Sequence, residues 1–129
     1  MFDFFKFKIV RRRVRRKTSS SSKKKYEMNK EAARRLVHAR LEYFNQFYHF
    51  EYKKVFIKNA KTKWGSCSSN KNLNFNYKIV HLPPELQDYI VVHELCHLGQ
   101  LNHSKAFWDL VGEMVPEHRE LRKRLRRVG

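Results

Sequence analysis

Residues 83–97 have the sequence PPELQDYIVVHELCH, and this stretch decides how the rest of the chain is interpreted. Proline is favoured in the first turn of a helix, so the two prolines predict a helix start. The apolar residues that follow recur at helical spacing and share one side of the helix with His93 and His97. Side chains at positions i and i+4 project from the same side of a helix, so both imidazoles can reach one metal ion.

Two nitrogen ligands are too few for a stable zinc site, because a catalytic zinc normally has three protein ligands and an open fourth position. A third histidine, His103, follows a plausible helix end at Gly99, and a turn there can bring it back toward the metal. Glu94 lies about 100° round the helix from His93, so it can reach a water at the site without being a ligand. We therefore expect one zinc ion per chain, with Glu94 as the catalytic base.

The third ligand has alternatives in the next helical segment. Glu113 and Glu117 lie at plausible distances along the chain. However, Glu117 directly follows Pro116 in a first helical turn, where a carboxylate is favourable without any metal. Imidazole also suits zinc. His103 therefore remains the preferred ligand beside His93 and His97.

The remaining pattern predicts an α+β fold. A helix is expected from Asn29, a good N-cap, with apolar residues recurring up to Tyr48. Alternation predicts a strand at 55–58 and a hairpin formed by 62–67 and 73–77, in which Gly65 suggests a bulge or a close backbone approach. Ser104 is expected to cap a third helix, and Pro116 to end it before a fourth. Helices on one face of a small antiparallel sheet follow from this order.

The first 25 residues differ from the rest in composition. Alternation over 5–9 is typical of a short strand, and a basic cluster, a serine run and three lysines follow it. We expect a basic arm at 1–25 and the catalytic domain at 26–129. The formal net charge of +17 favours weak, non-specific binding of nucleic acid or nucleotides. The basic cluster follows the apolar residues, which is the wrong order for a signal peptide, and no apolar run is long enough to span a membrane. A cytoplasmic protein with free, buried Cys67 and Cys96 is expected.

Five motifs in matching order extend the interpretation beyond the HExxH sequence: KWGSCSS at 63–69, LNFN at 73–76, LPP at 82–84, YIVVHELCH at 89–97 and NHSKAFW at 102–108. Together they resemble the YgjP-like metallopeptidase family, which is similar to the WLM and SprT-like zinc proteases. The resemblance covers roughly 26–127. It implies a zincin-like fold, a zinc cofactor held by His93, His97 and His103, Glu94 as base, and the WGSC hairpin beside the active-site cleft. The short, basic, serine-rich N-terminal part departs from the longer β-rich region of the family.

Three functions fit these residues. The first is a metallopeptidase acting on a peptide or protein, with Glu94 passing a proton from water to the leaving group. The second is a metal-dependent nucleotide phosphohydrolase, for which the basic surface would bind the phosphates. The third is a nucleic-acid-binding protein with a non-catalytic zinc site, which an intact Glu94 disfavours, since a structural site needs no base. For stabilising the oxyanion, His81, Tyr77 and Arg119 are candidates that only geometry can separate.

Overall fold

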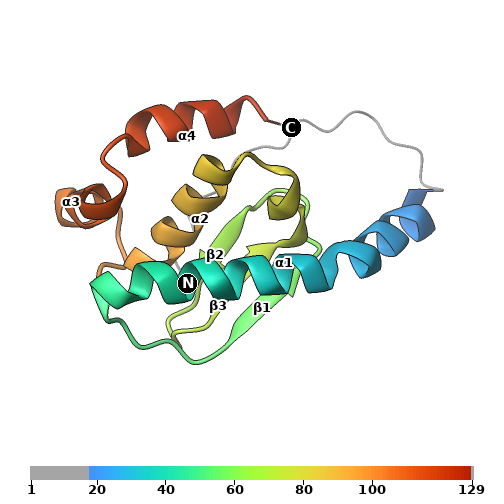
Figure 1. Cartoon of the computed structure of the whole chain (residues 1–129), viewed down its shortest axis with the longest axis horizontal. Helices are drawn as coiled ribbons and strands as arrows, with labels where there is room; N and C mark the ends of the chain where they lie inside the picture. The colour runs from blue at the N-terminus through green and yellow to red at the C-terminus, as the bar shows by residue number, and fades with distance from the viewer. Residues whose placement is uncertain (1–17, 129) are drawn as a thin grey trace.

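The computed structural model describes residues 18–128 and has the expected α+β architecture (Figure 1). The elements in chain order are α1 (Thr18–Tyr48), β1 (Val55–Lys58), β2 (Gly65–Cys67), β3 (Leu73–Asn76), the 3-10 helix η1 (Tyr77–His81), α2 (Pro84–Cys96), α3 (Lys105–Met114) and α4 (His118–Arg126). Within this range no helix is both long and apolar enough to cross a membrane. The strand expected at 5–9 and most of the basic arm lie outside the described residues.

The sheet is mixed, so the expectation of an antiparallel sheet is wrong for one pair of strands. β3 lies in the centre: it pairs antiparallel with β2, as the hairpin predicted, and parallel with β1. The loop from β1 therefore carries the chain past β3 to the far edge before the hairpin returns. Asn76 holds this loop, because its side-chain amide donates hydrogen bonds to the carbonyl oxygens of Ala60 (3.0 Å) and Lys63 (2.9 Å). Alternation in the sequence reveals strands but not their pairing.

The first helix already includes Thr18, the first described residue, eleven residues before the expected start at Asn29. Neither glycine nor proline occurs between residues 18 and 48. Lysine is a good helix former and serine is only mildly unfavourable, so no residue in the serine run would end the helix. Asn29 does not cap the helix. Its side chain instead donates a hydrogen bond to the carbonyl oxygen of Lys25, one turn earlier (2.8 Å). The part of the expected basic arm after residue 17 is thus helical.

The polar contacts that fix α1 against the rest of the domain include one with β1 and one with α2. The hydroxyl of Tyr26 donates a hydrogen bond to the carbonyl oxygen of Ile57 in β1 (3.0 Å). Farther along, the guanidinium of Arg40 makes a two-pronged contact with the carboxylate of Asp88 in α2, at 2.7 and 3.0 Å. Between these points the inward face of α1 is apolar and buried, as the periodicity predicted. α1 therefore packs against both β1 and α2.

α2 is the central element of the fold. It begins at Pro84, as expected, and every residue from Tyr89 to His97 is buried. α2 contacts α1, β2, α3 and α4, and Figure 1 shows the last two helices beside it. Ser104 caps α3, because its hydroxyl accepts a hydrogen bond from the backbone N–H of Phe107 (3.4 Å). α4 is anchored by Leu121 and Leu125, which are both buried.

Candidate active site

The end of α2 brings two histidines of the HExxH sequence together. His93 lies in the last helical turn and His97 is the residue that caps the helix, and their ring centres are 4.9 Å apart. Both side chains are almost fully buried. The turn after α2 keeps helical hydrogen bonding, since the N–H groups of Leu98 and Gly99 donate to the carbonyl oxygens of Leu95 and Cys96. The i, i+4 geometry expected of a metal-binding helix is therefore present.

His103 completes the group from the loop before α3. Its Nε2 atom lies 3.2 Å from Nε2 of His93, and its ring centre lies 4.6 Å from that of His97. One nitrogen from each of these three residues lies within 4.8 Å of the other two. Phe107 at the start of α3 packs against all three rings, with a near-parallel stack on His97 at 4.5 Å. The cap at Ser104 thus positions both His103 and the aromatic support beneath it.

The protonation of these rings suits a metal. The Nδ1 atom of His97 lies 3.1 Å from the carbonyl oxygen of Gln100, and because a carbonyl can only accept, Nδ1 carries the proton. This contact leaves Nε2 as the nitrogen that can ligate a metal, the arrangement that orients metal-binding histidines. Burial, and then the charges of its histidine neighbours, hold the pKa of His93 well below its usual range. Burial, His97 and Arg122 lower the pKa of His103 to about 4. Neutral imidazoles are the form that ligates.

Glu94 is fully buried and lies against β2. A Cβ atom on Gly65 would be 3.0 Å from both Cγ and Oε2 of the Glu94 side chain. Only glycine therefore allows the strand to approach the carboxylate this closely, and the close approach that Gly65 suggested in the sequence is confirmed. The negative charge of Glu94 also reaches Cys67 and Tyr89, since it contributes to the raised pKa of both groups.

The alternative ligands and the oxyanion candidates lie elsewhere. Glu113 and Glu117 are exposed, and among residues 18–128 neither belongs to the group that could hold a metal ion. Glu113 acts electrostatically on Tyr48 and Cys96 instead. The three residues considered for the oxyanion are not among the ring contacts of the histidine group: His81 and Arg119 are exposed, and the Tyr77 ring packs edge-on against Tyr26 at 5.5 Å.

Both cysteines belong to the core, as expected. Burial raises the pKa of Cys96 to about 12. Burial and the nearby Glu94 carboxylate raise the pKa of Cys67 to about 12 as well. Both thiols therefore stay protonated near neutral pH, which is unfavourable for a thiolate ligand.

An aromatic and cationic cluster beside the histidines was not predicted. The Trp108 ring centre lies 5.8 Å from that of His93 and 5.7 Å from that of His103. His118 stacks on Trp108 at 5.1 Å with ring planes 20° apart, and the guanidinium carbon of Arg122 lies 5.2 Å from the Trp108 ring centre. The available signal was the spacing of His118 and Arg122, which places both on one side of α4.

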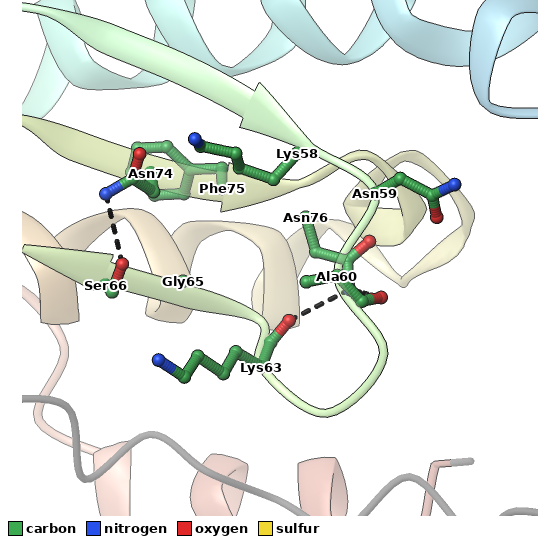
Figure 2. A pocket seen from close by; sticks show the side chains of 9 residues that line it. All are labelled: Lys58, Asn59, Ala60, Lys63, Gly65, Ser66, Asn74, Phe75 and Asn76. Carbon is green, nitrogen blue, oxygen red and sulfur yellow. Dashed lines mark hydrogen bonds between the residues drawn. The ribbon is translucent and has the colours of Figure 1, made fainter.

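A pocket of about 370 Å³ lies on the face of the sheet opposite to the one that Glu94 contacts. It is lined by Lys58, Asn59, Ala60, Lys63, Gly65, Ser66, Asn74, Phe75 and Asn76 (Figure 2). Ser66 and Asn74 project into it and are hydrogen-bonded to each other (3.1 Å), whereas the neighbouring Gly65 faces Glu94 on the opposite side. Since successive residues of a strand face opposite sides, the backbone of Gly65 separates the pocket from the carboxylate. The pocket is not part of the histidine site.

Comparisons with known proteins bear on the fold and the family of the chain. The zymogen structure of abylysin, a metallopeptidase from Pyrococcus abyssi, matches with a TM-score of 0.63 at 25% identity, over 69% of this chain and 90% of abylysin. The zymogen structure of jannalysin, a metallopeptidase from Methanocaldococcus jannaschii, matches with a TM-score of 0.56 at 27% identity, over 72% and 92%. No curated protein matches the chain significantly. The sequence pattern of the YgjP-like metallopeptidase domain matches residues 6–128. With nearly the whole chain covered, and with a metallopeptidase fold around three convergent histidines, this protein belongs to the YgjP-like metallopeptidase family.

Proposed function

We propose that this metallopeptidase is a zinc enzyme in which His93, His97 and His103 hold one ion and Glu94 is the general base. The observation that carries the proposal is the convergence of three imidazole nitrogens within 4.8 Å, next along the chain to a buried carboxylate. A structural zinc site needs four protein ligands and no base. Three ligands beside a glutamate are the composition of a catalytic site.

The donor set favours zinc over other common ions. Zinc–nitrogen bonds are about 2.0–2.1 Å long, so two ligands of a tetrahedral ion are about 3.3 Å apart, close to the 3.2 Å between the Nε2 atoms of His93 and His103. Three imidazoles without a carboxylate among them do not suit magnesium or calcium, which prefer oxygen ligands. When bound, zinc supplies Lewis-acid chemistry by polarising a carbonyl group and by lowering the pKa of water to about 7.

Two features of Glu94 support its proposed role as the base. It follows His93 directly in α2, and the close contact with Gly65 restricts where its carboxylate can lie. In the proposed reaction Glu94 accepts the proton that water gives up on attacking the peptide carbonyl, and then passes it to the departing amine. Cys67 and Tyr89 nearby stay protonated, so neither competes with Glu94 as a base near neutral pH.

Metal analysis combined with peptide hydrolysis tests this proposal. Purified protein should contain about one zinc per chain and should cleave members of a mixed peptide library. Glu94→Gln preserves shape and removes the base, so zinc should stay while turnover falls at least about a hundredfold. Glu113→Gln makes the same change at an exposed carboxylate away from the histidines and should retain full activity.

Two outcomes would contradict the proposal. Unchanged turnover in Glu94→Gln would exclude Glu94 as the base. Hydrolysis of nucleoside triphosphates in a parallel panel, with no peptide cleaved, would mean that the site catalyses phosphate hydrolysis and not peptide hydrolysis.

A further inference from the structure

Arg122 is held in a fixed position near the histidine group. α4 is anchored on the core by Leu121 and Leu125, on either side of Arg122 along the chain. One turn before Arg122, His118 stacks on Trp108. Arg122 is half-buried, and its guanidinium carbon lies 5.2 Å from the centre of the same Trp108 ring. An arginine stacked on an aromatic ring keeps a defined orientation while its N–H groups remain available at the edge of the guanidinium plane.

The guanidinium is close enough to act on whatever binds at the histidines. Because it lies 5.2 Å from the Trp108 ring centre, and that centre lies 5.7 Å from the His103 ring centre, the guanidinium is within about 11 Å of His103. An extended peptide advances about 3.3–3.6 Å per residue, so this distance corresponds to about three residues of a substrate.

Within residues 18–128, Arg122 has no acidic partner, whereas some other arginines do. Arg40 pairs with Asp88 and Arg124 pairs with Glu85, whereas no carboxylate of residues 18–128 lies within ion-pair distance of Arg122. A half-buried cation near a site that binds a metal cation raises the electrostatic energy of the protein. An anionic group of a ligand, bound between the guanidinium and the histidine site, would offset this cost. Guanidinium groups match carboxylates in particular, because two parallel hydrogen bonds can form.

We propose that Arg122, positioned by Trp108, is a carboxylate-binding subsite that selects peptides with a carboxylate within about three residues of the cleaved bond. The carboxylate is either an acidic side chain or the free C-terminus of the substrate. This inference rests on the proposed peptidase function, and it assigns to α4 a role in specificity that lies outside the metal ligands and the base.

Hydrolysis of matched peptides tests the proposal. One pair differs only by glutamate or glutamine at a position near the cleaved bond, with the C-terminus amidated. The other pair has a neutral sequence with a free or an amidated C-terminus. The wild-type protein should prefer the carboxylate member of one pair by about tenfold in kcat/KM, the effect of one charge-assisted interaction. In Arg122→Gln this ratio should fall to about one, and Arg122→Lys should restore part of it. Arg124→Gln removes a neighbouring charge that already has a partner, and should keep the wild-type ratio.

Two further measurements separate specificity from structure. Arg122→Gln removes a cation from the field of the metal site, so it should bind zinc at least as tightly as the wild type, whereas damage to the fold would weaken zinc binding. Calorimetric binding of the same peptides to zinc-loaded Glu94→Gln, with and without Arg122→Gln, gives a result even if no peptide is cleaved. Loss of the carboxylate preference on Arg122→Gln would support the subsite. Equal binding of the paired peptides to the parent protein would overturn it, independently of the proposed reaction.

Discussion

Replacing Gly65 by alanine tests how closely Glu94 is held against the sheet. The added Cβ would lie 3.0 Å from the carbonyl oxygen of Asn74 and 3.0 Å from both Cγ and Oε2 of Glu94. Contacts of 3.0 Å are shorter than the preferred non-bonded separation, so a neighbour must give by a few tenths of an ångström. The Asn74 carbonyl belongs to the central strand β3, which pairs on both sides. The Glu94 side chain is therefore the group that moves.

The expected magnitudes follow from this displacement. Overpacking costs about 1–3 kcal/mol, and alanine in a strand regains about 0.5–1 kcal/mol relative to glycine. Gly65 has no positive φ, so the backbone adds no strain. The free energy of unfolding should fall by up to about 2 kcal/mol. A displacement of 1 Å can lower catalysis about a hundredfold, so a shift of a few tenths of an ångström predicts a loss in kcat of at most about tenfold.

Gly112→Ala is the matched control for Gly65→Ala. Its Cβ would meet only His118, at 3.6 and 3.7 Å, which is ordinary contact. Alanine is favoured over glycine inside a helix by about 1 kcal/mol, so this variant should be slightly more stable and fully active. Urea unfolding, zinc content and peptide hydrolysis would be measured on both variants. Wild-type turnover in Gly65→Ala, at full zinc content, would refute the idea that β2 positions a catalytic Glu94.

Two further predictions concern the metal and the charge. His103→Ala should weaken zinc binding by more than the 10- to 100-fold that loss of an outer partner costs, measured by competition with a chelator. Glu113→Ala should bind zinc like the wild type, and the reverse result would mean that the third ligand is misassigned. Changing the exposed residues Lys23, Lys24 and Lys25 to glutamine should weaken DNA binding at low salt and flatten its salt dependence by about one unit of slope per lost phosphate contact. Equal binding by this variant would leave these lysines without a nucleic-acid role.

The parts of the fold that could be predicted from the sequence are those determined by near neighbours. Pro84 starts α2, Ser104 caps α3, and the turn between them brings His103 back to His93; each step spans only a few residues. By contrast, the parallel pairing of β1 with β3 depends on the loop that Asn76 holds through its hydrogen bonds. The alternation of apolar and polar residues does not indicate which strands pair. The start of α1 was misplaced for a related reason. The prediction relied on Asn29 as a good N-cap, although no helix-breaking residue precedes it. Tertiary contacts such as the hydrogen bond of Tyr26 to Ile57 favour the longer helix.

In the candidate site, too, some features depend on residues close together in the sequence and others on distant elements. The three histidines and Glu94 lie within eleven residues of one another, in one helix and the turn that follows, so the metal-binding group depends mainly on local structure. The groups that shape the surroundings come from distant elements: Gly65 from β2, and Arg122 from α4. No motif marks Arg122, because in the sequence α4 is an ordinary amphipathic, basic helix.

We therefore expect metal binding and substrate selection to depend on different elements of the protein. A substitution in β2 or α4 would alter the position of the proposed base or the charge offered to a substrate, while the three proposed ligands are positioned by α2 and the loop after it. Metal content and specificity should therefore vary independently. Gly65→Ala and Arg122→Gln should both keep about one zinc per chain, yet the first should lower turnover for all peptides and the second should act mainly on those with a carboxylate. If both variants instead lost zinc in proportion to activity, the site would behave as one cooperative unit, and the separation of metal binding from substrate selection would be wrong.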